Sequence, residues 1–451
     1  MNRFVYTAGI TLLSPALLTW MGLRARRAGG QWEVLSGQRF GRYTKAAPTR
    51  RPVWVHAVSL GETRAAQPLI QALLDSGQVV LLTHMTATGR AEAGRMFAKA
   101  IEEGHLIQEW LPYDFPGSVQ RFLRHYRPRL GVMIEREIWP NIIATARRKG
   151  IPMVLASARF SDNALRQSLR AGRVMREAYE SLAAVYAQTL QDAQRLEQAG
   201  AMAVRVSGNF KFDVSPPPNE VAQGKAFAAA LPRMMLTIAS TREGEDELFV
   251  NAIAQQLRRA AALGNNLRDE VLFCLIPRHP QRFEEAAALL LKAGVPFARR
   301  SKFPKGDGTT SSTIKACANA MVLLGDSLGE MPRYYAASQV AIVAGSFAPL
   351  GGQNLIEACA IGVPVIVGPH TRNFEQAAAD AIQEGAALRA PNADSAIQLG
   401  LQLLDDPQRL ARMGEAGAYW VQQHAGAVER VMNGLQEILG RQDQAAERAP
   451  R

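Results

Sequence analysis

Three glutamates follow apolar runs that have the character of buried strands, and their carboxyl groups could carry out acid–base chemistry. Glu62 follows residues 53–55 after a tight turn, and Glu135 and Glu137 follow residues 130–134. In open α/β sheets, ligands bind at the carboxyl ends of strands. A carboxylate there can act as general base to a hydroxyl, and burial among other acids raises one pKa and separates the roles. The alternatives are a helix-start acid for Glu62 and solvated salt bridges for the others.

The second half of the chain has residue types that suit a phosphate and a ribose. Gly351-Gly352 can bring the backbone close to a phosphate, with the N–H groups of the following helix start pointing at it. Glu357, about one turn into that helix, could accept both hydroxyls of a ribose. Arg278, flanked by prolines at a strand end, suits phosphate or carboxylate. Structural turns and a surface arginine are the alternatives.

Other charged residues at strand ends are less specific. Lys211, between two phenylalanines, can offset negative charge on a ligand or form a surface salt bridge. Asp326 and Glu330 suit helix capping as well as ligand binding. The sequence has no Asp-x-Asp and no paired-histidine spacing, so it indicates no metal or other cofactor.

An α/β fold is predicted by the alternation of apolar strands with helical segments that must position these residues. Pro140 is expected in the first turn of one helix and Ser118 as the N-cap of another. The predicted strands are residues 53–55, 79–83, 107–111, 130–134, 153–156, 184–187, 204–206, 235–239, 271–276, 321–324, 340–343 and 364–367.

The length of 451 residues predicts two domains rather than one core. The proline-rich stretch at residues 215–219 is the clearest linker, because consecutive prolines exclude helix and sheet interiors. We therefore expect a first domain at 28–214, a second at 215–440 and a disordered tail at 441–451. Two doubly wound domains facing each other across a cleft would bring the polar strand ends together.

Composition narrows the cellular context. The three cysteines are far apart and have no metal-ligand spacing, which indicates a reducing compartment without disulfides. The formal net charge of +12 favours an anionic partner. Eight of the basic residues lie between Arg24 and Arg51, with one acid among them. A nucleic-acid partner is not expected, because this excess lies beside an apolar segment.

That apolar segment, residues 4–23, is long enough to cross a bilayer core if it is helical. A signal peptide is disfavoured, because arginines rather than a small-residue cleavage site follow it. We predict a membrane anchor at residues 1–27, which either spans the membrane or lies on it. The basic residues that follow place the body of the protein on the cytoplasmic side.

Taken together, eight motifs in order resemble the 3-deoxy-D-manno-octulosonic acid (Kdo) transferases of lipopolysaccharide synthesis. These are membrane-anchored glycosyltransferases of the GT-B fold, with two Rossmann-like domains, and the resemblance covers nearly the whole chain. The motifs are Ser59-Leu60-Gly61-Glu62, Thr86-Ala87-Thr88-Gly89, Leu111-Pro112-Tyr113-Asp114, Glu135-Arg136-Glu137-Ile138-Trp139-Pro140-Asn141, Gly208-Asn209-Phe210-Lys211-Phe212-Asp213, Pro277-Arg278-His279-Pro280, Gly325-Asp326-Ser327-Leu328-Gly329-Glu330 and Gly351-Gly352-Gln353-Asn354-Leu355-Ile356-Glu357.

The resemblance implies a role for each matching residue. Glu62 looks like the catalytic base that takes the proton from the acceptor hydroxyl, and Glu135 and Lys211 look like a transition-state-stabilising pair. The acceptor it implies is lipid IVA, a phosphorylated glycolipid of the bacterial inner membrane. The donor it implies is CMP-Kdo, and the residues that resemble its pocket are Pro277, Arg278, Leu328, Gly329, Glu330, Asn354, Leu355, Ile356 and Glu357.

The chain departs from the family's usual pattern at a few positions. It has Arg136 between the two acids instead of Thr, Arg242 instead of His, and Gln353-Asn354-Leu355 instead of His-Asn-Pro. The last difference affects contacts with the donor. A GT-B enzyme that uses another nucleotide sugar, and a non-catalytic binder of anionic glycolipid, are the rival hypotheses. The motifs do not determine the number of Kdo units transferred or the oligomeric state.

Overall fold

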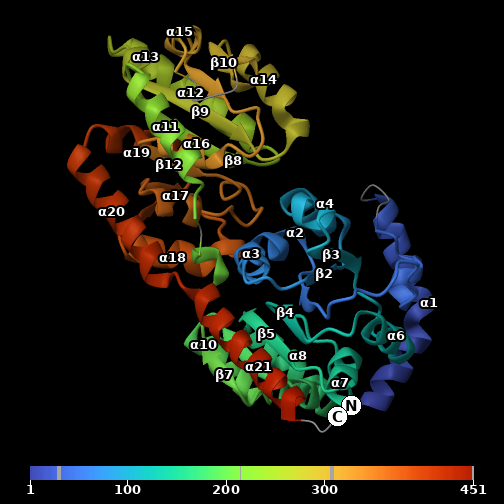
Figure 1. Ribbon diagram of the computed structural model, residues 1–451. Helices are drawn as coiled ribbons and strands as arrows, with labels where there is room; N and C mark the ends of the chain where they lie inside the picture. The colour runs from blue at the N-terminus through green and yellow to red at the C-terminus, as the bar shows by residue number, and fades with distance from the viewer. Residues whose placement is uncertain (28–31, 214, 305–308, 449–451) are drawn as a thin grey trace. The chain divides into compact units, whose positions relative to one another are not determined.

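The computed structural model describes residues 1–27, 32–213, 215–304 and 309–448 (Figure 1). The chain forms two compact units, one of Met1–Asp213 with His424–Arg451 and the other of Val214–Gln423. Each unit is built on a seven-stranded parallel sheet, which confirms the predicted α/β class.

The sheet of the first unit has the strand order β3-β2-β1-β4-β5-β6-β7. The order reverses direction between β1 and β4, and such a switch point is where open α/β sheets bind ligands. Strands β1, β2, β4 and β6 are buried at every position, as expected for a parallel sheet covered on both faces. The strands are β1 (Val53–His56), β2 (Val80–His84), β3 (Leu106–Trp110), β4 (Leu130–Ile134), β5 (Met153–Ala158), β6 (Ala184–Ala187) and β7 (Val204–Val206).

Short connections and capped helices join these strands. Ser59, Thr86 and Thr189 each accept a hydrogen bond at the start of a helix from the N–H three residues later. The helices are α1 (Arg3–Arg27), η1 (Gly37–Phe40), α2 (Leu60–Ala65), α3 (Gln67–Asp75), α4 (Ala87–Met96), α5 (Ala98–Glu102), α6 (Pro116–Tyr126), α7 (Pro140–Arg148), α8 (Asp162–Ala171), α9 (Arg173–Glu180), α10 (Leu190–Gln198), η2 (Phe210–Phe212) and α21 (Ala427–Arg448).

The sheet of the second unit has the order β10-β11-β9-β8-β12-β13-β14, with its switch point between β8 and β12. Two edge strands, β10 and β14, were not predicted, because each has only three residues and mixes polar with apolar side chains. The strands are β8 (Met234–Thr241), β9 (Val271–Pro277), β10 (Phe297–Arg299), β11 (Val322–Leu324), β12 (Val340–Val343), β13 (Val365–Val367) and β14 (Ala387–Arg389).

Helices of the second unit pack against this sheet, around one large apolar core and a smaller one. They are α11 (Pro218–Ala230), α12 (Glu245–Ala262), α13 (Leu267–Glu270), η3 (Pro280–Arg282), α14 (Phe283–Lys292), η4 (Arg300–Lys302), α15 (Ser311–Asn319), α16 (Met331–Ala337), α17 (Ile356–Ile361), η5 (Arg372–Phe374), α18 (Glu375–Gln383), α19 (Ala393–Leu404) and α20 (Pro407–His424).

Helix boundaries follow proline more closely than the sequence analysis assumed. Pro140 begins α7, as predicted. Pro116 begins α6, so Ser118 is inside the helix and its prediction as N-cap was wrong. Pro218 begins α11, so the predicted linker is partly helical. All three prolines occupy the first helical position, where the missing N–H has no intrahelical partner to lose.

The last helix corrects the predicted domain limits. Helix α21 belongs to the first unit rather than to a second domain ending at residue 440. Every fourth residue of its first half is buried in the core under β1, β2 and β4, at Ala427, Val431, Leu435 and Leu439. The predicted tail was also wrong as far as residue 448, because α21 continues to Arg448 and Gln442 donates to the Arg129 carbonyl. Residues 449–451 of that tail, residues 28–31 of the predicted first domain and its end at 214 lie outside the described residues.

At the other end of the chain, α1 runs along one side of the first unit (Figure 1). Its segment Arg3–Leu23 has a mean hydropathy of 1.4 and none of it is fully buried. Among the described helices it alone is long and apolar enough to cross a membrane, judged by length and composition.

Candidate functional site

The first unit gathers three carboxylates at its switch point. Strands β1 and β4 are neighbours, with His56 beside Met133 at their carboxyl ends. Glu62 follows β1, and Glu135 and Glu137 follow β4. The pKa of Glu62 is raised to about 7, first because the carboxyl is largely removed from water, then because Glu135 and Glu137 repel its charge. The structure therefore brings together the three acids that the sequence singled out.

The start of α2 holds Glu62 in place. Ser59 is the N-cap, and its hydroxyl accepts a hydrogen bond from the Glu62 N–H at 3.4 Å. In return, Glu62 Oε2 accepts a hydrogen bond from the Val58 N–H at 2.6 Å. This reciprocal arrangement resembles a capping box. It turns the carboxylate back toward the end of β1, where a ligand at the switch point would lie.

Glu135 has a strained backbone. It is the first residue after β4 and has a φ of 59°, which is rare for a residue with a Cβ. Its N–H donates to the Ala156 carbonyl at 3.0 Å, which keeps it in register with β5. Strain of this kind persists where the surrounding structure imposes it, often at functional sites. No sequence signal had indicated this conformation.

A buried histidine lies next to this cluster, and the sequence analysis gave it no role. His56 is fully buried, and burial lowers its pKa to about 3, so the imidazole is neutral. Its Nδ1 is 3.0 Å from the Thr83 carbonyl, and its Nε2 is 4.0 Å from Glu137 Oε2. Within the described part of the chain His56 Nε2 has no hydrogen-bond partner. A lone histidine at a strand end gives no signal that distinguishes it from an ordinary core residue.

Glu137 itself is held by an aromatic neighbour. Its Oε2 accepts a hydrogen bond from Trp139 Nε1 at 3.0 Å. Burial raises its pKa, the Trp139 hydrogen bond and Arg136 oppose that rise, and Glu135 adds to it. Arg136, which departs from the family's usual Thr, thus favours the ionised form of Glu137.

Lys211 lies elsewhere in the sheet. It is in the short helix η2 after β7, and the strand order places β5 and β6 between β4 and β7. The neighbouring Phe210 is buried against α21, and Asp213 accepts a hydrogen bond from the Val428 N–H at 2.6 Å. This motif therefore fastens α21 to the first unit, and the pairing of Lys211 with Glu135 stays a prediction.

The switch point of the second unit is organised by Glu245, a residue that the sequence analysis did not single out. Its side chain is fully buried. It accepts hydrogen bonds from the N–H groups of Gly345, Phe347 and Ala348 at 2.6, 2.8 and 3.2 Å. It also accepts one from the Arg242 N–H at 2.9 Å. One carboxylate thus holds the loop that follows β12. Glu245 and Gly345 are 100 residues apart in the chain, so sequence analysis could not detect this contact.

The double glycine after this loop is required by its backbone. Gly351 and Gly352 have φ angles of 91° and 81°, in the left-handed region. A Cβ at Gly351 would lie 2.7 Å from the side-chain nitrogen of Asn373. Backbone conformation and packing therefore already require glycine in this turn, and contact with a phosphate stays a prediction.

Residues 354 and 355 precede α17, and residues 356 and 357 begin it. Asn354 Oδ1 accepts a hydrogen bond from the Ile356 N–H at 3.1 Å, and its amide donates to Glu357 Oε1 at 3.0 Å. The side chains of Leu355 and Ile356 are each 1% exposed, so they belong to the core. If these two residues contact the donor, they do so through backbone groups.

Arg278 and Glu357 act in opposite directions on the pKa of one tyrosine. Pro277 ends β9, and the Arg278 N–H donates to the Thr241 carbonyl of β8 at 2.9 Å. Burial raises the pKa of Tyr335, Glu357 raises it further and Arg278 lowers it. Two predicted donor-binding residues therefore lie within electrostatic range of the Tyr335 hydroxyl.

Glu330 and Asp326 serve the structure of the second unit. Glu330 Oε1 pairs with Arg300 at 2.6 Å and with Arg333 at 3.0 Å. Asp326 pairs with Arg299 at 2.6 Å. Burial acts to raise its pKa, but the hydrogen bonds it receives from Ser301 and Arg299 outweigh burial and lower it.

The rest of this motif is more exposed. Leu328 is 70% exposed, and Gly329 has a φ of 84°. Contacts of Leu328, Gly329 and Glu330 with the donor stay a prediction.

Comparisons with known proteins agree on one family. Residues 36–214 match the family model described as 3-deoxy-D-manno-octulosonic-acid transferase (kdotransferase), and residues 313–420 match glycosyl transferases group 1. The 3-deoxy-D-manno-octulosonic acid transferase of Bordetella pertussis is 56% identical over 98% of this chain and 100% of its own. The enzyme of the same name from Haemophilus influenzae is 30% identical over the same shares.

A solved structure supports the fold. The glycosyltransferase of Rickettsia africae superimposes with a TM-score of 0.53 over 86% of this chain and 99% of its own, at 12% identity. The two parallel seven-stranded sheets are thus those of a GT-B-like glycosyltransferase. Since a relative of more than half identity extends over nearly the whole chain, the chain belongs to the family of 3-deoxy-D-manno-octulosonic acid (Kdo) transferases.

Proposed function

We propose that this Kdo transferase moves Kdo from CMP-Kdo to lipid IVA at the cytoplasmic face of the bacterial inner membrane. The observation that carries the proposal is the carboxylate cluster at the first switch point, in which Glu62 has a pKa of about 7. A general base is most effective when its pKa is near the working pH. The names of the Bordetella and Haemophilus relatives support Kdo as the transferred sugar.

The reaction is a single inverting displacement. The acceptor hydroxyl oxygen attacks the anomeric carbon of Kdo, and Glu62 takes the hydroxyl proton as the new bond forms. The bond from that carbon to the phosphate oxygen breaks, and CMP leaves with the electron pair. Glu135 and Lys211 are assigned to stabilising the charge that develops in the transition state.

The CMP part of the donor is assigned to the second unit. Arg278 offers a guanidinium to the phosphate, and Glu357 offers a carboxylate to the ribose hydroxyls. Pro277, Leu328–Glu330 and Asn354–Ile356 complete the proposed pocket. Support comes from the opposite effects of Arg278 and Glu357 on the pKa of Tyr335. The loop that Glu245 holds at this switch point supports it as well.

Helix α1 supports a membrane location. It is apolar, it has no acidic residue in its first turn, and it ends in basic residues. Basic residues beside an apolar segment favour the cytoplasmic side and attract the anionic surface of that leaflet. The lipid IVA acceptor would reach the enzyme from the same surface.

The test is transfer from CMP-Kdo to purified lipid IVA, with the mass of the product as readout. One added Kdo would establish the activity with single transfer, and two or more would establish a processive enzyme. CMP should inhibit and UDP should not. If lipid IVA gave no product while CMP still bound, the assignment of lipid IVA as acceptor would be overturned. Inhibition by UDP in place of CMP would overturn the assignment of CMP-Kdo as donor.

The pH dependence of transfer follows from the raised pKa of Glu62. A base must be ionised, so kcat/KM should fall roughly tenfold per pH unit below a midpoint of about 7 and level off above it. Glu137→Gln removes one of the charges that repel the ionised Glu62 carboxylate, so it should move the midpoint to lower pH. The measurement is kcat/KM from pH 5 to 9 with both proteins. A flat profile across pH 7 would contradict the role of Glu62 as base.

A further inference from the structure

Helix α1 presents one face to the rest of the first unit along its whole length. Residues that are half-buried or buried recur every three or four positions, as expected for one stripe of a helix lying on a surface. The stripe begins in the second turn and ends two residues before the helix does. It comprises Thr7, Ile10, Ser14, Leu18, Met21 and Ala25, and its neighbours Tyr6, Ala8, Gly9 and Gly22 are also half-buried.

Polar contacts fix the N-terminal end of α1 to the body of the unit. The Tyr6 hydroxyl donates to Asp114 Oδ2 at 2.9 Å, and the Thr7 hydroxyl donates to Asn141 Oδ1 at 3.1 Å. Asp114 is 5% exposed and also accepts from the Asn141 N–H at 3.0 Å. The Val174 N–H, at the start of α9, donates to the Met1 carbonyl at 3.0 Å. The helix is therefore attached at its beginning as well as along its length.

The opposite face of α1 is apolar and exposed. Phe4 and Leu12 are 81% and 80% exposed, and no acidic residue lies in the helix. A continuous exposed apolar stripe of this length is typical of a surface that meets a membrane or a partner. Its large side chains are Phe4, Val5, Leu12, Leu13, Leu17, Trp20 and Leu23.

These contacts conflict with a helix that crosses the bilayer. If residues 3–23 lay in the hydrocarbon, the segments packed against them would have to enter it too. Helix α7 ends in Arg147 and Arg148, and α9 begins with Arg173. Charged side chains are costly in the hydrocarbon region. A helix that lies flat keeps its contacts with the body and still places its outer face in the acyl layer.

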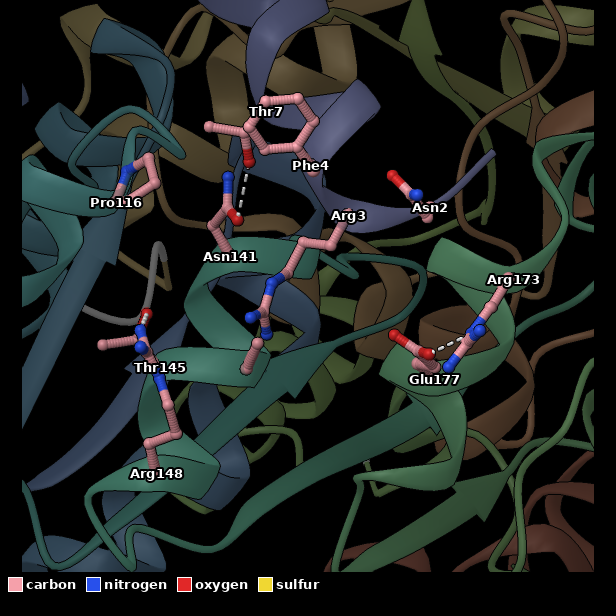
Figure 2. Close-up of a pocket in the computed structure, with 11 residues that line it drawn as sticks. Asn2, Arg3, Phe4, Thr7, Pro116, Asn141, Thr145, Arg148, Arg173 and Glu177 are labelled. Atoms are coloured by element: carbon pink, nitrogen blue, oxygen red, sulfur yellow. Dashed lines mark hydrogen bonds and ion pairs between the residues drawn. The ribbon is translucent and has the colours of Figure 1, made fainter.

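A basic pocket lies at the N-terminal end of α1, between α1, α7 and α9 (Figure 2). Its volume is about 540 Å³. Figure 2 shows Arg173 and Glu177 paired on one side and Thr145 with Arg148 on the other. Within the residues that the structure describes, neither Arg3 nor Arg148 forms an ion pair with a carboxylate. Two guanidinium groups therefore remain for an anionic ligand beside the exposed ring of Phe4.

We propose that α1 lies in the plane of the membrane surface, and that this pocket binds the phosphate of an anionic lipid head group. The inference rests on the membrane location proposed above. Arg3 and Arg148 pair with the phosphate, and the outer face of α1 inserts among the acyl chains. The body of the enzyme is thereby held on one side of the bilayer, with both ends of α1 on that side.

The pocket is tested by binding of the purified full-length protein to vesicles of phosphatidylcholine, with and without phosphatidylglycerol. Each basic residue near an anionic surface contributes about tenfold or less to binding, so Arg3→Gln with Arg148→Gln should weaken partition to the anionic vesicles roughly 30-fold. Partition to phosphatidylcholine alone should be unchanged. The matched control is Arg258→Gln with Arg412→Gln. These substitutions remove the same amount of charge from two exposed positions of the second unit.

The outcomes separate the competing explanations. An equal loss in the control would show a general effect of charge and overturn the pocket. A loss of inorganic phosphate binding without any change in vesicle partition would assign the pocket to free phosphate and overturn the lipid assignment. If the unsubstituted protein bound neither kind of vesicle, the membrane location itself would fail.

The orientation of α1 is tested with a membrane-impermeant maleimide on sealed inverted membrane vesicles. The three native cysteines are buried, so introduced cysteines can be labelled selectively. Lys99→Cys marks the body, and Asn2→Cys marks the start of α1; both positions are exposed. We expect both to be labelled without detergent. Labelling of Asn2→Cys only after detergent would show that α1 crosses the bilayer, and would overturn the in-plane orientation whatever the pocket binds.

Discussion

Glu62→Gln is expected to lower the turnover of Kdo transfer on the order of 100- to 10,000-fold, which is the usual contribution of a positioned general base. Glutamine has nearly the same shape but cannot take the proton from the acceptor hydroxyl. Its carbonyl oxygen can still accept the hydrogen bond from the Val58 N–H, so the start of α2 should remain in place. The measurement is kcat with saturating CMP-Kdo and lipid IVA.

The matched control is Glu102→Gln, the same change at an exposed position on α5. It should leave turnover unchanged, and CMP binding should be the same in both variants. Turnover of Glu62→Gln within a few-fold of the unsubstituted enzyme would refute the assignment of Glu62 as base.

The stability of the same variant provides an independent check. The folded pKa of Glu62 is raised from 4.5 to about 7, so the folded state binds the proton more tightly than the unfolded state does. This group therefore stabilises the fold most at low pH, and that contribution is lost as the pH rises from about 4.5 to 7. Glu62→Gln removes the charge that is unfavourable above pH 7. We expect its Tm at pH 8 to equal or exceed that of the unsubstituted protein, and a clear loss of Tm would indicate a damaged fold.

Glu245→Ala is expected to destabilise the second unit by about 3–5 kcal/mol, the range observed when one partner of a buried charged network is removed. The substitution leaves four backbone N–H groups without their carboxylate acceptor. Three of them belong to the loop of residues 345–348, so that loop should loosen first. The measurements are chemical unfolding and hydrogen exchange of these amides, which should become much faster.

Glu247→Ala is the control, because it alters an exposed acid in the first turn of the same helix. It should change stability by less than about 1 kcal/mol, as is usual at the surface. Glu245→Gln should fall between the two, because it keeps one acceptor oxygen. Unchanged exchange at Gly345 and Ala348 in Glu245→Ala would contradict the role given to this carboxylate.

Most strands of both sheets were predictable because their signal is local. Parallel strands covered on both faces consist of continuous apolar runs, and β1, β4 and β12 fit that pattern. The short edge strands β10 and β14 were missed because they lack this local signal. Their sequences mix polar and apolar residues, and pairing with a neighbouring strand stabilises them. The positions of Glu62 and Glu135 after strands were likewise predictable, and only their distance from each other was not.

The partners of buried polar groups were not predictable. Glu245 and its loop are a hundred residues apart, and His56 is a single histidine among seven in the chain. Neither has a spacing that indicates its contacts. The left-handed backbone of Glu135 is imposed by its surroundings, since glutamate has no local preference for it.

The sequence by itself determined that the chain has two parallel α/β sheets, that acids follow particular strands, and that an apolar helix comes first. These properties depend on residues close together in the chain. Only the tertiary structure decided that α21 belongs to the first unit, that burial and two neighbouring carboxylates raise the pKa of Glu62, and which side of α1 faces the body. An apolar stripe shows that a helix packs against a core but not against which one, and the pKa of an acid depends on charges that only folding brings near it.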